Sequence, residues 1–366
     1  MRRSPLLATL LAALAAVFAA PATAAQRPST IPVIGIGEQN REIFSSRHFK
    51  ALDVQHVRVI TAWNSLRVGW QRAELDAYMA AARATGAQVL LGFGHARSEK
   101  RKVRRRVPGV REFTKEFLKY KKRYPWVKDW LTWNEANHCG EPTCHKPRRV
   151  ARFYNNIRHN CFGCNVVAGD VLDTPTMTAW VREFRKTARK DKLIWGLHNY
   201  IDANRFRTSG TKALLKAAPR GQIWFTETGG LVVRRNGSRI AFPGNKKHQV
   251  KATKQVFRLA RLSPRVRRIY FYHWQPSRAR LPSWDSALVD QRGEPRPAYR
   301  VLRSFVRKFA RMAEQRAAKK RASQPPAPGS TTAPVSTPAP GGTPAPGGTP
   351  APGGTPAPGS TPPPAG

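Results

Sequence analysis

Residues 56–94, HVRVITAWNSLRVGWQRAELDAYMAAARATGAQVLLGFG, contain the pattern that decides the fold. Two β-rich runs, at 56–63 and 88–94, enclose a stretch at 73–85 whose apolar residues are Leu75, Tyr78, Met79 and Ala82. Apolar residues at this spacing lie on one face of a helix. A strand, a helix and a second strand in this order predict a βαβ unit with two parallel strands.

The same alternation continues along the chain. Further strands are expected at 31–37, 127–133, 166–171, 193–198, 222–227 and 268–274, which makes eight in all. Helices are expected at 110–123, 148–158, 176–190, 211–218, 246–262 and 297–320, and the first connection, 41–53, is short. Eight βα units in roughly 300 residues favour a (β/α)8 TIM barrel over an open doubly wound sheet. Gly35-Ile36-Gly37 lacks the third glycine of a dinucleotide fingerprint, which disfavours a nucleotide-binding sheet.

The two ends of the chain differ from this pattern. Residues 1–25 combine Arg2-Arg3, an apolar run and small residues, which predicts a signal peptide; a retained N-terminal anchor is the alternative. Residues 324–366 have no charge and repeat Thr-Pro-Ala-Pro-Gly-Gly, which predicts a disordered Pro/Gly/Thr-rich tail. The folded domain is therefore expected at 26–323. No later segment has the length and hydropathy of a membrane span.

The chain is strongly basic, with 65 Lys and Arg against 21 Asp and Glu in 366 residues and a net charge of +44. Because only Arg2 and Arg3 are charged outside 26–323, that domain carries +42. Basic residues gather at 97–123 and at 303–321, and after Glu227 at Arg234, Arg235, Arg239, Lys246 and Lys247. A solvated coat is one interpretation, and an anionic partner (acidic polysaccharide, wall polymer or lipid headgroup) is the other. Export and the absence of an aromatic–basic or helix-turn-helix pattern disfavour nucleic acid.

Two of the expected strands have a glutamate where the strand meets its loop, in Leu131-Thr132-Trp133-Asn134-Glu135 and Trp224-Phe225-Thr226-Glu227-Thr228. In a (β/α)8 barrel the chemistry takes place at the carboxyl ends of the strands. Two carboxyl groups that face each other there suit glycoside hydrolysis, in which one protonates the leaving oxygen and the other attacks the sugar or activates water. Ion-paired structural glutamates are the alternative.

Trp133-Asn134-Glu135 and Thr226-Glu227-Thr228-Gly229 resemble the acid/base and nucleophile motifs of the clan-A retaining glycoside hydrolases, which are (β/α)8 barrels. The resemblance covers nearly all of 31–305, is closest to the secreted, cellulase-like barrels of high-GC bacteria, and implies that Glu135 is the acid/base and Glu227 the nucleophile. It implies supporting roles for further residues that bind the sugar or the nucleophile: Asn134, Arg58, His198, Tyr200 and Trp274.

Physical requirements accompany these roles. Burial near Trp133 is expected to keep Glu135 protonated, and hydrogen bonds from Arg58 and Tyr200 to keep Glu227 ionised. A retaining mechanism predicts that the carboxyl groups lie about 5–5.5 Å apart, and an inverting one roughly 6.5–9.5 Å. Further strand-end residues that we expect to line sugar subsites, or else to pack beneath loops, are His95, Asp170 and Trp63.

Four cysteines lie in two close pairs, Cys139 with Cys144 and Cys161 with Cys164. The histidines nearby, His138, His145 and His159, make zinc an alternative. The helix between the pairs spans roughly 18 Å, so one shared metal site is disfavoured. In an exported protein two local disulfides are favoured instead.

The sequence therefore predicts a secreted, monomeric, retaining O-glycosyl hydrolase that cleaves a β-linked poly- or oligosaccharide without a metal or another cofactor. The charge leaves open whether that carbohydrate is anionic and whether the protein associates with the cell wall. Transglycosylation by the same residues also stays open. The alternative function is a catalytically weak or inactive barrel that binds anionic cell-wall polysaccharide.

Overall fold

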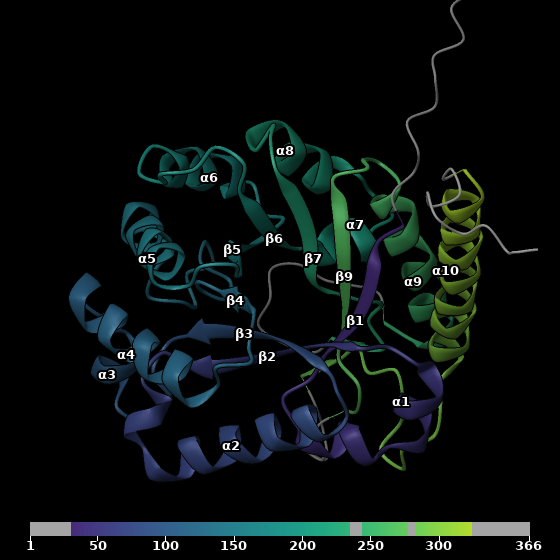
Figure 1. Ribbon diagram of the computed structural model, residues 1–366, viewed down its shortest axis with the longest axis horizontal. Coiled ribbons are helices and arrows are strands. Elements are labelled where there is room, and N and C mark those ends of the chain that lie inside the picture. Colours follow the sequence, from purple (N-terminus) through teal and green to yellow (C-terminus); the bar gives the residue numbers. More distant parts are fainter. Residues whose placement is uncertain (1–30, 235–243, 277–282, 324–366) are drawn as a thin grey trace, which may run out of the picture. The chain divides into compact units, whose positions relative to one another are not determined.

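Strands and helices alternate around a closed barrel in the computed structural model of the chain (Figure 1). The structure describes residues 31–234, 244–276 and 283–323. Contacts divide the chain into two units, Met1–Ala317, which contains the barrel, and Ala318–Gly366, of which only the first six residues are described. The predicted signal peptide and tail, and with them Arg235 and Arg239, lie outside the described residues.

Eight parallel strands form the barrel, and the last of them pairs with the first, so that Val33 lies beside Arg268 and Gly37 beside Tyr272. This closed order confirms the (β/α)8 fold. The barrel strands are β1 (Val33–Gly37), β2 (His56–Ala62), β3 (Gln88–Gly94), β4 (Asp129–Leu131), β5 (Asn165–Leu172), β6 (Ile194–His198), β7 (Gln222–Thr228) and β9 (Val266–Tyr272).

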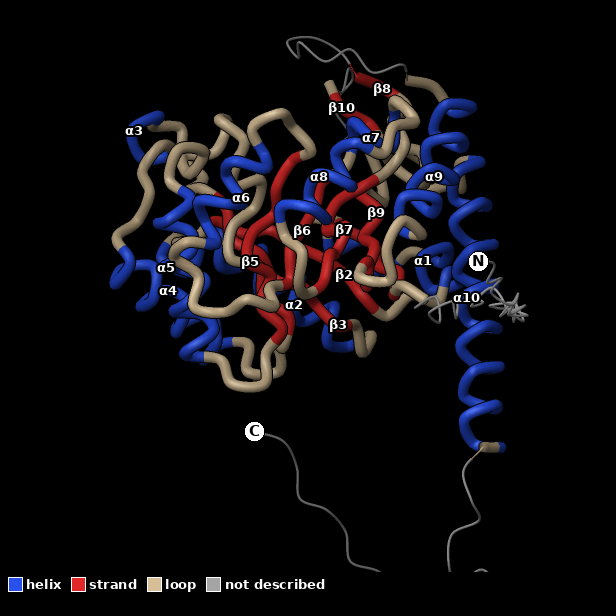
Figure 2. The backbone as a smooth tube through the Cα atoms, turned by 90° about the horizontal axis from the view of Figure 1, so that it is seen from above, coloured by secondary structure: helices blue, strands red, loops and turns tan. Residues whose placement is uncertain are grey.

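Helices lie outside the strands (Figure 1). They are α1 (Arg47–Leu52), α2 (Gly69–Ala84), α3 (Arg101–Arg104), α4 (Val110–Arg123), α5 (Pro147–Asn160), α6 (Met177–Arg185), α7 (Tyr200–Asn204), α8 (Ser209–Ala217), α9 (Lys246–Ala260) and α10 (Pro297–Ala322), with 3-10 turns at η1 (Arg41–Ser45) and η2 (Ser65–Arg67). Two short antiparallel strands, β8 (Val233–Arg234) and β10 (Trp284–Asp285), pair beside α7 (Figure 2). No described helix combines the length and the hydropathy that a membrane crossing requires.

Strand β4 and helix α6 are each several residues shorter than the sequence predicts. Strand β4 ends at Leu131 instead of residue 133, although the N–H groups of Thr132 and Asn134 still donate to the carbonyls of Val167 and Phe93 on its two neighbours. The chain then reaches Glu135, whose φ is +44°. Helix α6 ends at Arg185 instead of residue 190. Asn155 of α5 captures the chain beyond it, because its side chain donates to the Thr187 carbonyl and accepts from the Arg189 N–H, both at 3.0 Å.

Apolar side chains fill the inside of the barrel, so that only its mouth is open to a substrate. The interior cluster takes one residue from each of five strands: Leu90, Leu131, Val167, Trp224 and Tyr270, all at most 1% exposed. A larger apolar layer lies between the strands and the surrounding helices, and the predicted face of α2 is buried in it. This packing holds the carboxyl ends of the strands in fixed positions.

Candidate active site

Glu135 and Glu227 meet at the mouth of the barrel. Glu135 follows β4, Glu227 lies in β7, and an oxygen of each lies within 4.8 Å of an oxygen of the other. Their side chains are 26% and 13% exposed, although the groups around them are almost fully buried. The backbone of Glu135 is left-handed, a conformation that costs a non-glycine residue roughly 1–2 kcal/mol and is found preferentially at functional sites.

Arg58 and Tyr200 hold Glu227 from below. The Arg58 guanidinium is fully buried, and its Nη1 donates to Glu227 Oε2 at 2.9 Å. The Tyr200 hydroxyl donates to the other oxygen, Oε1, at 3.1 Å. Both bonds are those expected from the sequence, and together they hold the two oxygens of the Glu227 carboxylate in place.

A count of hydrogens fixes the protonation of His198. Arg58 Nη2 lies 2.6 Å from Asn134 Oδ1, 2.8 Å from Asp170 Oδ2 and 3.2 Å from His198 Nε2, but it carries only two hydrogens. Because the two closer oxygens take them, His198 Nε2 keeps its own hydrogen and donates it to Asp170 Oδ2 at 3.0 Å. The other ring nitrogen, Nδ1, faces Glu135 Oε1 at 3.2 Å. His198 and Glu135 therefore compete for one proton.

Electrostatics place that proton on His198. Burial alone would lower the pKa of His198, but the carboxylates of Glu227 and Asp170 outweigh it and raise the pKa to about 10. Burial would likewise raise the pKa of Asp170, and the charges of Arg58 and His198 lower it instead. The centre thus holds two buried cations among three carboxylates.

The expectation that burial near Trp133 keeps Glu135 protonated is wrong. The Trp133 indole is buried away from it and donates to Glu141 Oε2 at 2.9 Å. Burial does act to raise the pKa of Glu135, but the hydrogen bond and charge of His198, helped by His138 and Arg58, outweigh it and lower the pKa. Glu135 is therefore more acidic than an ordinary glutamate in the free protein.

The mouth opens into two cavities of about 980 and 630 Å³ that share a floor. The first extends between the loop after β1 and helix α2, and the second towards α7, β8 and β10. The residues common to both are Glu38, Gln39, Asn40, Glu135, Glu227 and Tyr272. The cavities are therefore two arms of one cleft, and the glutamate pair lies where they meet.

Three predicted subsite residues lie elsewhere. Trp274 is 2% exposed and packs edge-on against Phe49 and Tyr299, because β9 already ends at Tyr272 and the chain has turned into the helical layer. Tyr272 lines the cleft in its place. Trp63 is buried beneath arginine side chains, and His95 is bonded to Glu141 at 2.7 Å. Neither lines either arm.

Asp170 also differs from its prediction, since it lies under the site instead of lining a sugar subsite. It is fully buried, and its Oδ1 accepts from the Thr226 hydroxyl at 2.5 Å. Strand β6 makes room for it at Gly196, where an added Cβ would lie 1.8 Å from Asp170 Oδ1. A buried acid at a strand end, next to a glycine in the following strand, was the sequence signal for this role.

Sequence reasoning missed Glu38, which directly follows β1. Its Oε1 accepts from the N–H groups of Gln39 and Asn40 at 2.7 and 3.0 Å. Its Oε2 accepts from those of Trp274 and Gln275 at 3.0 and 3.2 Å. One carboxylate thus joins the loops that follow the first and the last barrel strands. An acidic residue at the end of a strand was visible in the sequence, but its four backbone partners were not.

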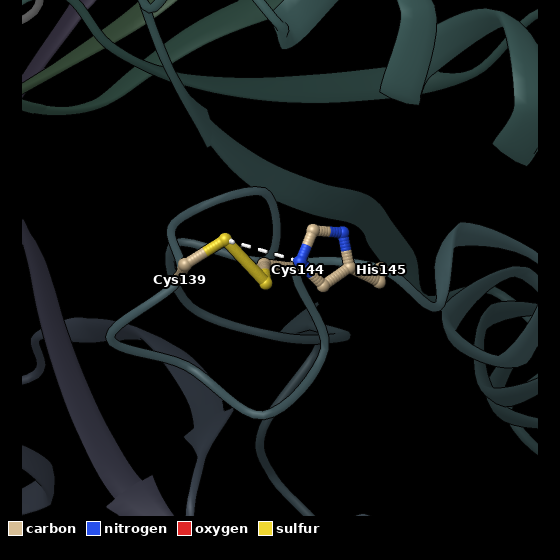
Figure 3. Close-up of side chains that lie close together, drawn as sticks. All are labelled: Cys139, Cys144 and His145. Atoms are coloured by element: carbon tan, nitrogen blue, oxygen red, sulfur yellow. Dashed lines mark hydrogen bonds between the residues drawn. A yellow bond between two sulfur atoms is a disulfide. The ribbon is translucent and has the colours of Figure 1, made fainter.

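Both predicted disulfides form, Cys139 with Cys144 and Cys161 with Cys164 (Figure 3 shows the first). His145 Nε2 lies 3.7 Å from Cys139 Sγ, but a sulfur in a disulfide is no thiolate ligand, which disfavours the zinc alternative. A second group with ligand spacing is Glu135, His198 and Glu227. There the Arg58 and His198 cations already neutralise the carboxylates and oppose a metal ion.

The sequence matches no protein-family model and no curated protein. Solved structures with the same fold include a GH5_18 protein from Streptomyces cattleya, in complex with GlcNAc (TM-score 0.56, 16% identity, 81% of this chain and 82% of that one). Xylanase 10B from Thermotoga maritima is another (0.55, 13%, 76% and 95%), and a fungal β-1,4-galactanase is a third (0.54, 13%, 75% and 99%). At these identities the likeness shows a shared barrel fold.

Proposed function

We propose that this protein is a glycoside hydrolase that cleaves β-linked glycans with retention of configuration, with Glu227 as nucleophile and Glu135 as acid/base. The observation that carries the proposal is the pair of glutamates, whose oxygens approach within 4.8 Å at the centre of an open cleft. That approach agrees with the short separation of about 5–5.5 Å in retaining enzymes and is shorter than the roughly 6.5–9.5 Å of inverting ones. The fold shared with xylanase and galactanase structures supports the same chemistry.

The reaction follows from the two environments. A Glu227 oxygen attacks the anomeric carbon while the bond to the leaving oxygen breaks, and Glu135 gives that oxygen its proton. Glu135 then takes a proton from water, whose oxygen attacks the same carbon and releases Glu227. Asn134 lines the cleft, and because its Oδ1 is bonded to Arg58, its amide N–H groups remain for a sugar hydroxyl. No step requires a metal or another cofactor.

Export and a monomeric state belong to the proposal as well. Two disulfides in one chain suit an oxidising compartment outside the cytosol, which agrees with the leader predicted at 1–25. The basic surface fits a location beside an anionic cell wall. Mass determination of the secreted protein, with and without reduction, tests the leader cleavage and the disulfides together.

Replacement of each glutamate tests the chemistry. On aryl β-glycosides and a panel of β-linked polysaccharides, we expect wild type to turn over at least one substrate and Glu227→Gln to lose all measurable activity. Glu135→Gln should lose about 10²–10⁴-fold, and least on aryl glycosides whose leaving group needs no proton. The control is Glu183→Gln, a half-buried side chain on α6 that pairs with Arg148 and Lys186 and does not line the cleft.

Proton NMR of the first product decides the stereochemistry. Retention releases the β-anomer first, and initial release of the α-anomer would contradict the assignment of Glu227 as nucleophile. A wild-type protein that binds anionic polymer but turns over no glycan would instead support the alternative, a binding barrel.

A further inference from the structure

Each arm of the cleft is lined by an arginine that stacks on a tryptophan; Trp284 lines the smaller arm itself, whereas Trp70 lies beside the larger arm, next to Arg97. In the larger arm Arg97, from the loop after β3, lies with its guanidinium carbon 4.5 Å from the ring centroid of Trp70, in the first turn of α2. Trp70 is 53% exposed, which is unusual for so large an apolar side chain. An exposed aromatic face at the rim of a cleft is a surface for a ligand.

The smaller arm repeats the arrangement on a different element. Arg234 of β8 lies opposite Trp284 of β10 in their two-stranded sheet, with its guanidinium carbon 4.8 Å from the Trp284 ring. The Tyr200 ring meets Trp284 edge-on at 4.7 Å, and the Tyr200 hydroxyl binds the nucleophile. An aromatic wall therefore continues from Glu227 to Arg234, and both Arg234 and Trp284 line the arm.

The chemistry of these pairs suits an acidic sugar. An indole face packs against the apolar face of a sugar ring, and a guanidinium presents a planar fork that fits a carboxylate. Stacking on the ring fixes the fork without consuming its N–H groups. Arg97 gives one of its five N–H groups to Glu74 at 2.8 Å, which leaves four for a ligand.

Two of the other acids that line the cleft are already engaged by backbone N–H groups of the protein. Glu38 accepts four backbone N–H bonds, and Asp173 accepts those of Ile201 and Asp202. These bonds offset part of the negative charge that would repel an acidic chain. The net charge of +44 on the whole protein adds a long-range attraction of the same sign.

We infer, resting on the proposed function, that the substrate is a β-linked polysaccharide that carries carboxylate groups. Its chain spans both arms, contacts Trp70–Arg97 on one side and Trp284–Arg234 on the other, and is cleaved internally.

Matched hexasaccharides test the recognition, with the Glu227→Gln variant so that nothing is cleaved. The probes are β-1,4-linked hexamers of mannuronate and of mannose, and of glucuronate and of glucose, because each pair differs only in its carboxylates. By calorimetry in low salt, at least one acidic hexamer should bind ten-fold or more tightly than its neutral twin. Equal or weaker binding of both acidic hexamers would overturn the inference.

Substitutions test whether the two arginine–tryptophan pairs cause the preference for acidic hexamers. In the same Glu227→Gln background, Arg97→Met and Arg234→Met should each remove several-fold of the acidic preference and leave neutral binding unchanged. Trp70→Ala should weaken the binding of an acidic hexamer and of its neutral twin alike. Arg220→Met is the control, since it removes the same charge at an exposed position that pairs with Asp191 and does not line the cleft. If Arg220→Met has the same effect as the cleft variants, net charge alone explains binding and the inference fails.

Product length tests the span. Wild type acting on the longer polymer of the preferred hexamer should first release chains of intermediate length, and release of only mono- or disaccharides would refute binding across both arms. Failure of the two proposals is distinguishable. If the protein binds acidic glycans selectively but cleaves none, the proposed hydrolase function is wrong and the inferred acidic ligand stands. If it cleaves neutral glycans and shows no preference for acidic ones, the hydrolase function stands and the inferred acidic substrate is wrong.

Discussion

The single proton between His198 Nδ1 and Glu135 Oε1 is the residue-scale feature with the most direct consequence for activity. Glu135 has to carry that proton when it meets a leaving group, yet His198 holds it in the free protein. The cations that face Glu135 are His198, His138 and Arg58, and all three act to lower its pKa. The Glu227 carboxylate, within 4.8 Å, acts in the opposite direction, but the cations outweigh it. The proposed acid is therefore protonated only at lower pH than an ordinary glutamate.

This arrangement predicts an acid-shifted pH profile. As pH rises, kcat/KM on a polysaccharide should fall early, because the pKa of Glu135 is lowered. His198→Asn removes the cation, so that burial dominates, the pKa of Glu135 rises and the basic limb moves to higher pH. The control is His159→Asn, at the far end of α5, which should leave the basic limb of the pH profile unchanged. A basic limb that stays fixed or moves down in His198→Asn would refute this reasoning.

The same histidine makes stability depend on pH. Because the folded-state pKa of His198 is raised to about 10, its contribution is fully present below the unfolded value of about 6.5 and is lost as pH rises through 10. Wild type should therefore lose more thermal stability between pH 6.5 and 10 than His198→Asn does. Scanning calorimetry of both proteins across that range measures the difference, and parallel curves would count against a charged His198.

At the scale of elements, three strands meet around the Asp170 carboxylate. It projects from β5, fills the space above Gly196 of β6 and accepts a bond from Thr226 of β7. Gly196→Ala would drive a methyl group into that carboxylate and push the strands apart, at a cost of about 1–3 kcal/mol or more. Urea unfolding measures the change. Gly69→Ala is the control, because nothing lies within 4 Å of an added Cβ there, and it should be neutral or slightly stabilising.

The two disulfides lie in different loops, one between β4 and α5 and the other between α5 and β5, and we expect their removal to have different effects on activity. Each closes a short loop, so that replacing either pair by serine should lower the free energy of unfolding by about 2 kcal/mol. Only the Cys139–Cys144 loop carries His138, which faces Glu135 at 3.5 Å, and Glu141, which holds His95. We therefore expect reduced kcat in Cys139→Ser/Cys144→Ser and near-normal kcat in Cys161→Ser/Cys164→Ser. Equal kcat in the two double variants would show that the first loop does not position the acid.

At the scale of the whole molecule, an excess of +44 charges repels itself. Salt shortens the range of that repulsion to about 10 Å at 0.1 M, so the melting temperature should rise between about 20 and 300 mM sodium chloride. The same salt should weaken binding to an acidic glycan, because it screens an attraction there. A melting temperature that is flat or falls with salt would mean that local ion pairs outweigh the net charge.

The sequence was sufficient for the barrel because each βα unit is a local pattern. Strand β3 and helix α4 have the predicted bounds, and Glu135, Glu227, Arg58 and Tyr200 meet because parallel strands bring their carboxyl ends to one edge. Their catalytic roles stay predictions. Helix α6 was overextended because its end depends on a contact with Asn155 of another helix, which no local pattern contains.

The site was less predictable where it depends on which way a side chain points and on which distant residue it contacts. The family resemblance placed Trp274 in the cleft as a residue at the end of the last strand, but the strand ends two residues earlier and Tyr272 lines the cleft. The acidity of Glu135 was misjudged because the hydrogen bond from His198 crosses from one strand end to another. Such bonds between distant segments decide the electrostatics, and composition does not encode them.

The Glu38 carboxylate has a consequence for how the protein is made. Half of its partners, the N–H groups of Trp274 and Gln275, come more than 230 residues later in the chain. During synthesis Glu135 and Glu227 emerge before the cleft can form, because Tyr272 and the loop after β9 complete it. A nascent chain stalled before β9 would contain the whole reacting pair and still be inert, so activity begins only when almost all of the barrel has been made.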